Sequence, residues 1–174
     1  TPHGLVHQGW KDSHDSVFHS DGSDAPPPIA LCEVQGYVYA AKITASFLAE
    51  ALGYDQRSQG FAQQAKNLKK KFNEIFWCED LSTYALALDG NQKLCKTRAS
   101  NAGHCLFTGL AYEDRAALLG KTLTHKMFFS GWGIRTVATT EARYNPMSYH
   151  NGSVWPHDNA LIALGFARYG FKEK

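Results

Sequence analysis

The sequence predicts an all-α fold in which an inner layer of helices is covered by an outer layer. Segments that are poor in charge alternate along the chain with segments that carry one apolar stripe and one charged face. The first kind is typical of helices buried on most sides, and the second of helices with one wet face. A simple bundle gives every helix a wet face, so the alternation favours two concentric layers. Aromatic-rich loops precede the charge-poor segments, and in this layout they would meet at one end of the inner layer.

The composition suits a single globular domain over residues 1–174. Hydrophobic residues make up 44% of the chain and aromatic residues 13%, which is enough to build a buried core. The formal net charge is only +2, and this argues against nucleic acid or an anionic membrane as a partner, since both need a strongly basic surface. The first residues lack a signal-peptide pattern. Because the chain does not begin with Met, we expect a processed or excised piece of a longer protein.

Four cysteines occur at spacings that fit neither a redox motif nor a zinc site. They are Cys32, Cys78, Cys95 and Cys105. Without a CxxC pair, the simplest interpretation is buried free thiols in a reducing compartment. The sequence therefore predicts a cytoplasmic protein.

The first half of the chain is predicted to hold a loop and two unlike helices. Residues 1–27 are rich in Gly, Ser, Asp, His and Pro and are predicted to be a loop at the active site. A helix over 28–52 follows, because proline is tolerated in a first turn. It is apolar nearly all round, yet charges interrupt it too often for a membrane span. The helix over 55–77 is amphipathic, with an apolar stripe of Phe61, Ala65, Leu68, Phe72 and Ile75.

The second half begins with a predicted β-hairpin. The stretch "STYALALDGNQKLCKT" over 82–97 alternates in polarity and turns at residues 89–91. A charge-poor helix over 100–111 comes next, then an amphipathic helix over 112–129. A final charge-poor helix is predicted over 157–169.

Four helix entrances combine Trp, Tyr or His with Gly, Asn, Asp or Arg. They are "HQGWKDSHD" (7–15), "SNAGH" (100–104), "SGWGIRT" (130–136) and "YHNGSVWPHD" (149–158). Trp and Tyr offer flat apolar faces, while the polar side chains offer directional hydrogen bonds. A sugar, which has C–H faces and a rim of hydroxyls, matches this pairing. Capping and packing would explain any single entrance, but four of the same kind favour a sugar-binding site.

Two carboxylates in the first entrance suggest glycoside hydrolysis. That reaction needs one protonated carboxylic acid and a second carboxylate that acts as base or nucleophile. Asp12 and Asp15 are the candidates. A catalytic acid must stay protonated near neutral pH, and burial beside Trp10 could provide this for Asp12. Asp15 suits a turn or a helix cap equally well.

Other kinds of site have less support. The sequence contains no P-loop, GxGxxG, GxSxG or HExxH motif. His150, His157 and Asp158 lack a recognised metal-ligand spacing, and the adjacent His104 and Cys105 would not face each other on a helix. We therefore expect neither a metal nor a cofactor.

The motifs together resemble a known family. "QGWKDSHDS", "PIALCEVQGYVYAA", "NAGH", "GWGIRT" and "YNPMSYHNGSVWPHDNALIA" resemble the catalytic domain of bacterial amylo-α-1,6-glucosidases of the glycogen-debranching type. These belong to the six-hairpin glycosidases, which also include trehalases and processing α-glucosidases. The resemblance covers nearly the whole chain. It implies a partial (α/α)6 toroid, with about five to six helices and one short β-hairpin.

The resemblance also implies an activity and a set of site residues. It suggests hydrolysis of α-glucans or oligosaccharides by general acid/base catalysis, inverting, with Asp12 as the general acid. The expected partner is a carbohydrate. The candidate sugar-contacting residues come from the quoted motifs: Trp10, Lys11, Asp15, Glu33, the glutamine of "EVQG" (Gln35, beside Gly36), His104, Trp132, Arg135, Tyr149, His150, Asn151, Trp155, His157 and Asp158.

The general base stays unassigned. Related debranching domains carry a Glu soon after the "HNG" segment, where this chain has Ser153 and Val154. Glu33 and Glu141 are the remaining local candidates, and neither has specific support. Two alternatives to a hydrolase remain open, namely a carbohydrate-binding or inert remnant and a structural helical domain that caps another protein. An incomplete toroid would expose apolar helix faces, so we also expect self-association.

Overall fold

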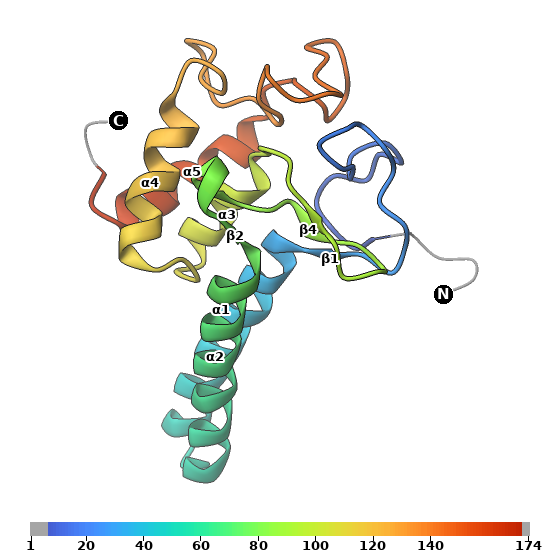
Figure 1. The fold of residues 1–174 in the computed structure, drawn as a ribbon. Coiled ribbons are helices and arrows are strands. Elements are labelled where there is room, and N and C mark those ends of the chain that lie inside the picture. The colour runs from blue at the N-terminus through green and yellow to red at the C-terminus, as the bar shows by residue number, and fades with distance from the viewer. Residues whose placement is uncertain (1–6, 172–174) are drawn as a thin grey trace.

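A computed structural model describes residues 7–171 of the chain. Residues 1–6, which open the predicted loop, and residues 172–174, which close the predicted domain, lie outside the described residues. The fold is mostly helical, which confirms the predicted class (Figure 1). The helices are α1 (Cys32–Ala51), α2 (Asp55–Phe76), α3 (Asn101–Phe107), α4 (Glu113–Thr124) and α5 (Pro156–Arg168). The strands are β1 (Ala30–Leu31), β2 (Trp77–Cys78), β3 (Thr83–Tyr84), β4 (Ala87–Leu88) and β5 (Leu94–Cys95), with a short 3-10 helix at Glu79–Leu81.

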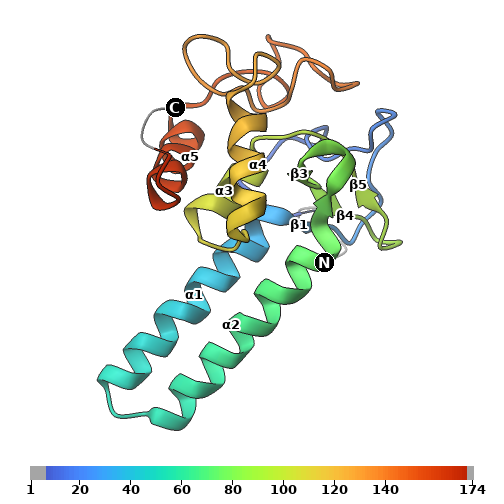
Figure 2. The ribbon, with the colours of Figure 1, turned by 60° about the vertical axis from the view of Figure 1, so that its left-hand side comes forward.

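The helices are arranged as a body and a projecting arm. α3 contacts α1 on one side and α5 on the other, while α2 packs on α1 and α4 packs on α3. The antiparallel helices α1 and α2 extend away from the body as a hairpin, which we call the arm (Figures 1 and 2). The three charge-poor helices are thus neighbours, and each amphipathic helix covers one of them. This order agrees with the alternation in the sequence.

The first helix begins later than the sequence predicts. Residues 30–31 form strand β1, which pairs antiparallel with β4 so that Ala30 faces Leu88 and Leu31 faces Ala87. Leu31 has an extended backbone (φ −76°, ψ 144°). The prediction of a helix from residue 28 was wrong, because the hairpin edge offers this segment backbone partners that a helix start would not use.

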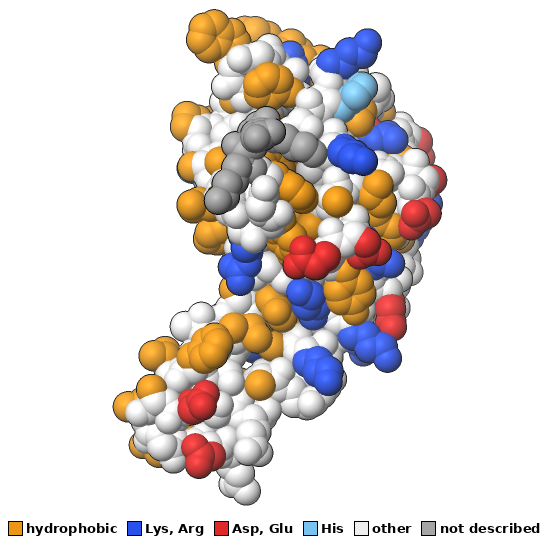
Figure 3. Space-filling view, turned by 90° about the vertical axis from the view of Figure 1, so that its left-hand side faces the viewer, with side chains coloured by type: hydrophobic (Ala, Val, Ile, Leu, Met, Phe, Trp, Pro, Cys, Tyr) orange, Lys and Arg blue, Asp and Glu red, His pale blue; other side chains and the backbone are white. Residues whose placement is uncertain are grey.

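The outer half of α1 is exposed, although its apolar sequence predicts burial on most sides. Phe47 is 66% exposed, and Leu48 and Leu52 are also exposed. Among the described elements, α2 is the helix that runs beside this half (Figure 2). Hydrophobic side chains therefore spread over the surface of the arm (Figure 3). The prediction assumed neighbours on every side, which the described residues supply only at the base of the helix.

The apolar stripe of α2 is confirmed except at its last member. Ala65 and Phe72 are buried, whereas Ile75 is 44% exposed. Phe76 is buried in its place and stacks on Phe72 with ring centroids 4.7 Å apart. Positions four apart share a helix face, so Phe76 continues the stripe from Phe72 as naturally as Ile75 does.

The predicted hairpin is present but shorter than expected. β4 pairs with β5, with Ala87 opposite Cys95. The turn is held by Asp89, whose carboxylate accepts the backbone N–H groups of Asn91 and Lys93. Tyr84, which was assigned to the same strand, instead lies in β3 and pairs with β2. The two small sheets connect the arm to the loops of the body.

Two predicted helices also end early. The helix predicted over 100–111 stops at Phe107, because Gly109 adopts a left-handed backbone (φ +75°) that ends the helix. The helix predicted over 112–129 stops at Thr124. The short α3 leaves much of α1 without an inner neighbour.

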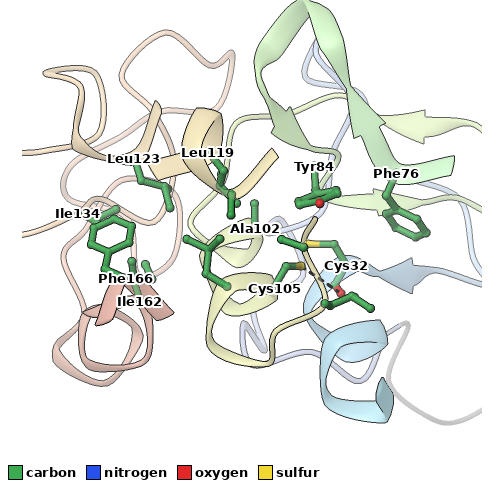
Figure 4. Close-up of a cluster of buried hydrophobic side chains, with 14 of the residues drawn as sticks. Cys32, Phe76, Tyr84, Ala102, Cys105, Leu119, Leu123, Ile134, Ile162 and Phe166 are labelled. Atoms are coloured by element: carbon green, nitrogen blue, oxygen red, sulfur yellow. Dashed lines mark hydrogen bonds between the residues drawn. The ribbon is translucent and has the colours of Figure 1, made fainter. Parts of the chain in front are cut away.

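The main core lies where α3, α4 and α5 meet the base of α1. Buried side chains from these elements include Cys105, Leu119, Leu123 and Ile162 (Figure 4). The thiol of Cys105 donates to the carbonyl of Cys32 at 3.8 Å. All four cysteines are free and buried, as predicted. Within residues 7–171, the helices lack an apolar stretch long enough to cross a membrane.

Candidate functional site

Three helices place polar side chains at one end of the body. Glu33 lies in the first turn of α1, His104 in α3 and Asp158 in the first turn of α5, and all three are fully buried. Unpaired backbone N–H groups make a helix N-terminus favourable for negative charge. Two of the three helix starts therefore carry a carboxylate in the position that the helix dipole stabilises.

A chain of hydrogen bonds joins these helices. His104 Nε2 lies 2.7 Å from Asp158 Oδ1, and His104 Nδ1 lies 2.5 Å from the hydroxyl of Tyr37, which belongs to α1. The second oxygen of Asp158 and the Oε1 atom of Glu33 are buried without a hydrogen-bond partner among the described residues. Such unpaired buried atoms are rare in folded proteins and concentrate at functional sites.

Lys11 is buried above this polar layer. Its Nζ donates to the carbonyl of Thr136 at 2.8 Å and lies 5.4 Å from the ring centre of Trp10. Burial lowers the pKa of Lys11 to about 8, although the charges of Asp158 and Glu33 oppose this. The side chain was predicted to contact a sugar. In the structure it ties the first entrance to the third, and its contact with a sugar stays a prediction.

An aromatic cluster covers the buried layer. We define it as Trp10, Tyr149, His150, Trp155 and His157. The Trp10 ring meets His157 edge-on with ring centroids 4.8 Å apart, and meets His150 in the same way at 5.3 Å. Tyr149 contacts Trp155 at 4.9 Å. The first and fourth entrances, far apart in sequence, thus form one surface, as their shared composition predicts.

The cluster rests on His104. The Trp10 ring stacks on the imidazole of His104 with centroids 6.0 Å apart and planes inclined by 22°. The third entrance joins through Thr136, whose hydroxyl accepts the backbone N–H of Gly152. All four predicted entrances therefore meet at the N-terminal ends of α1, α3 and α5.

Asp12 lies at the edge of the aromatic cluster, and its side chain is 72% exposed. Its Oδ1 atom is 3.8 Å from His150 Nδ1, which is hydrogen-bonded to the hydroxyl of Ser13 at 2.6 Å. The expectation that Trp10 buries Asp12 was wrong. Lys11 turns inward to reach its carbonyl partner, and its neighbour Asp12 consequently turns outward.

Within residues 7–171, His150 is the histidine that lies within 4 Å of the Asp12 carboxylate. Its imidazole is buried, and burial lowers its pKa, with the charge of Lys11 lowering it further. The carboxylates of Asp12 and Asp15 act in the opposite direction but more weakly. His150 is therefore neutral near pH 7 and can hydrogen-bond without adding a charge beside Asp12.

Asp15 connects the first entrance to the fourth and to Arg143. Its Oδ2 atom accepts a hydrogen bond from the side-chain amide of Asn151 at 3.0 Å, and its backbone carbonyl accepts one from Arg143. Asn151 is buried. Both were predicted to contact a sugar, and the structure shows them hydrogen-bonded to each other.

Among the described residues, three predicted side chains have neither a ring contact nor a hydrogen bond with the aromatic cluster. Trp132 is 96% exposed, and its ring has no ring contact with any of the described residues. The guanidinium of Arg135 donates to the carbonyl of Phe128, and the amide of Gln35 donates to the carbonyl of Leu31. The side chains of Arg135 and Gln35 therefore make local loop and helix contacts.

Tyr37 was missed by the sequence analysis. It lies four residues after Glu33 and therefore on the same face of α1, a spacing that could have identified it. Glu141, considered as a base, is ion-paired with Arg98 at 3.5 Å. Within residues 7–171 no group of three potential metal ligands gathers.

A cavity of about 420 Å³ lies elsewhere, at the base of the arm. Its lining includes Tyr39, Ile43 and three lysines of α2, and it contains no carboxylate. Glycoside hydrolysis requires carboxyl groups. The aromatic cluster with Asp12 is therefore the better candidate site.

Comparisons with known proteins identify the family of the chain. Residues 4–174 match the family described as mannosylglycerate hydrolase MGH1-like glycoside hydrolase domain. No curated protein matches the sequence. One similar structure is that of the GH63 mannosylglycerate hydrolase from Thermus thermophilus in complex with glucose, with 21% identity and a TM-score of 0.71, covering 83% of this chain and 36% of that chain.

A second similar structure is neutral trehalase Nth1 from Saccharomyces cerevisiae, with 16% identity and a TM-score of 0.73, covering 92% of this chain and 31% of that chain. The chain spans only about a third of either relative. These likenesses show part of an (α/α)6-toroid fold. The resemblance to the six-hairpin glycosidases is thereby confirmed at the level of that group, and this chain belongs to the MGH1-like glycoside hydrolase domain family.

Proposed function

We propose that this chain supplies the general acid and part of the sugar-binding surface of a glycoside hydrolase that acts on α-glucans or oligosaccharides. The observation that carries the proposal is the exposed carboxylate of Asp12 beside an aromatic cluster at three helix N-termini. Family membership supports sugar hydrolysis in general. The finer assignment, to α-1,6-linked glucans of the glycogen-debranching type, rests on the sequence motifs.

The geometry suggests how the reaction would use Asp12 and the aromatic cluster. Asp12 would donate a proton to the leaving oxygen of the glycosidic bond, while a water attacks from the opposite face of the sugar. The rings of Trp10, Tyr149 and Trp155 would carry the C–H faces of the sugar. An inverting mechanism places the second carboxyl group about 6.5–9.5 Å from the acid, with room for the water.

The described residues offer no clear second carboxylate. Glu33 and Asp158 are fully buried, and Glu141 is ion-paired. Asp15 is hydrogen-bonded to Asn151. We therefore propose that residues 1–174 bind a sugar but hydrolyse it slowly or not at all. The alternative function, a carbohydrate-binding part without its own base, is favoured by the same observation.

Binding of a glucose-containing sugar is the first test. The relative from Thermus thermophilus was crystallised with glucose, so maltose and isomaltose are suitable probes. Titration of either sugar should change the tryptophan fluorescence of the native chain. Trp155→Ala should weaken binding about 10-fold or more, as expected for loss of a stacking ring. Trp132→Ala is the matched control, because its ring lies outside the cluster.

The binding proposal has a clear contrary result. An unchanged fluorescence signal, with no heat of binding by calorimetry, would favour a purely structural domain. Equal weakening by both tryptophan variants would show that the sugar does not sit on the aromatic cluster.

Hydrolysis tests the acid. If the native chain releases any glucose from a limit dextrin, Asp12→Asn should reduce the rate by about 10²–10⁴-fold, the usual contribution of a general acid. Rapid glucose release by the native chain would contradict the proposal that it lacks a general base. An Asp12→Asn variant as active as the native chain would contradict the role of Asp12.

We also propose that the protein works in the cytoplasm. Four free and buried thiols suit a reducing compartment. Detection of the protein only outside the cytoplasmic fraction of the cells that produce it would contradict this.

A further inference from the structure

We propose that Tyr37 is a positioning residue of the candidate sugar site and acts on Trp10 through His104, which Asp158 holds from the other ring nitrogen. The role in sugar binding rests on the proposed function, whereas the hydrogen-bond chain itself does not. The ring of Tyr37 lies against that of His104, with centroids 6.0 Å apart. Its influence on the aromatic cluster would pass through this imidazole, which lies beneath Trp10.

The hydrogen-bond chain crosses the three inner helices. Tyr37 comes from α1, His104 from α3 and Asp158 from α5. The hydroxyl of Tyr37 is 2.5 Å from His104 Nδ1, and Nε2 of the same ring is 2.7 Å from Asp158 Oδ1. Each helix therefore supplies one member, and the middle member is held from both sides.

The chemistry of the partners sets where the protons lie. A carboxylate only accepts hydrogen bonds, so His104 Nε2 carries the N–H that faces Asp158. In this tautomer Nδ1 is the acceptor, and the Tyr37 hydroxyl donates to it. Burial raises the pKa of Tyr37, which keeps the phenol protonated and able to donate. Both ring nitrogens of His104, a fully buried side chain, are thereby satisfied.

Two hydrogen bonds at opposite nitrogens fix the plane of an imidazole ring. The plane of His104 matters because Trp10 stacks on it, inclined by 22°. Trp10 precedes Lys11 and Asp12, so a tilt of its ring would be transmitted to the loop that carries the proposed acid. Without the Tyr37 hydroxyl, the His104 ring keeps only its hydrogen bond to Asp158. The ring can then tilt, and Trp10, which stacks on it, can tilt with it.

A test without sugar examines the hydrogen-bond chain. Tyr37→Phe is compared with Tyr39→Phe, since Tyr39 is also half-buried on α1 and its hydroxyl has no hydrogen-bond partner among the described residues. In ¹⁵N NMR spectra, Tyr37→Phe should shift the Nδ1 signal of His104 and the indole N–H signal of Trp10. Tyr39→Phe should leave both in place. Unchanged signals in Tyr37→Phe would overturn the proposal.

Asp158→Asn provides a second route if Tyr37→Phe does not fold. It acts on the same imidazole from the other nitrogen, so it should shift the same two signals. Trp10→Phe identifies the Trp10 indole signal among the four tryptophans of the chain. An Asp158→Asn variant in which the Trp10 signal does not move would contradict transmission from His104 to Trp10.

A maltose titration then measures the effect on the site. Tyr37→Phe should weaken binding by about 2- to 10-fold, the usual effect of one net hydrogen bond, and Tyr39→Phe should not weaken it. A folded Tyr37→Phe variant that shows the shifted His104 signal and binds maltose as tightly as the native chain would overturn the positioning role. If the native chain itself binds no maltose, the proposed function fails, while the NMR signals still decide whether the hydrogen-bond chain exists.

Discussion

The two ends of α1 differ in a way that its composition conceals. At the first turn, Cys32, Glu33 and Gly36 are buried among α3 and the loops of the site. Toward the last turn, Phe47 and Leu52 are exposed on the arm. A charged residue is thus buried and two large apolar residues are not. Burial in a helix follows from what packs against each turn, and not from how apolar the segment is as a whole.

The buried end also carries the polar atoms that have no partner. Glu33 Oε1, Asp158 Oδ2 and Trp10 Nε1 lack hydrogen bonds within the described part of the chain. Leaving such atoms unpaired costs stability. The site end therefore combines burial with unpaired polar atoms, whereas the outer half of α1 exposes apolar side chains.

The largest effect is expected at the base of the arm, where packing is tight. Phe72 is buried and its ring lies 4.7 Å from that of Phe76 and 4.8 Å from that of Tyr84. Phe72→Ala should lower the free energy of unfolding by about 3–5 kcal/mol, because it removes contacts and leaves a cavity. Ile75→Ala, three residues away on the exposed side, should cost roughly 0.5 kcal/mol. Urea denaturation measures both, and equal losses would show that the two positions are not on different faces.

The second-largest loss of stability is expected at the buried carboxylate of Asp158. Asp158→Asn removes the charged acceptor of the His104 N–H, and it should lower the free energy of unfolding by about 1.5–3 kcal/mol, the usual range for a hydrogen bond to a charged group. The control is Asp114→Asn in the first turn of α4, where the side chain is exposed; its effect should stay within about 0.5 kcal/mol. If Asp158→Asn proves neutral in urea denaturation, the polar layer is not a structural element.

The contribution of Lys11 to the free energy of unfolding should depend on pH. Burial lowers its pKa from the ordinary 10.5 to about 8, so between these values the unfolded chain binds more protons than the folded chain. The contribution of this group to stability therefore rises with pH across that window. The difference in free energy of unfolding between the native chain and Lys11→Met should increase by about 2 kcal/mol from pH 8 to pH 10.

Comparison with Lys11→Met is needed because other groups titrate in the same range. Burial raises the pKa of the Cys95 thiol to about 12 and raises that of the Cys32 thiol as well. These thiols lower stability as pH rises, since the unfolded chain loses their protons first. They are present in both proteins and cancel in the difference. A difference that stays constant from pH 8 to pH 10 would show that Lys11 is solvated in the folded chain.

The contrast between the two ends also explains what the sequence could predict. Repeated apolar residues, such as Phe72 four positions before Phe76, define helix faces locally, and the order of inner and outer helices followed from them. The entrances of the site were found because Trp10, His150 and Trp155 share one chemistry across distant segments. Local composition is sufficient for both.

Orientation could not be predicted in the same way. Whether Lys11 or Asp12 points inward depends on the carbonyl of Thr136, which lies 125 positions along the chain from Lys11. The start of α1 depends likewise on the edge of a hairpin formed by later residues. The role of Tyr37 depends on a histidine and an aspartate from two other helices. Such tertiary partners decide direction, while periodicity decides only the face.

The smallest effect on stability is expected at the exposed end of α1. Replacing Phe47 and Leu52 together by Ser should change the free energy of unfolding by no more than about 0.5 kcal/mol, because both side chains already face solvent. The same change should reduce self-association, since clustered exposed apolar side chains favour contact between molecules. Light scattering at increasing protein concentration measures this, with Glu50→Gln on the same exposed turn as control. A double variant that loses several kcal/mol of unfolding free energy would mean that this face is covered within the chain. A native chain that stays monomeric at every concentration would mean that the exposed apolar side chains of the arm do not drive association.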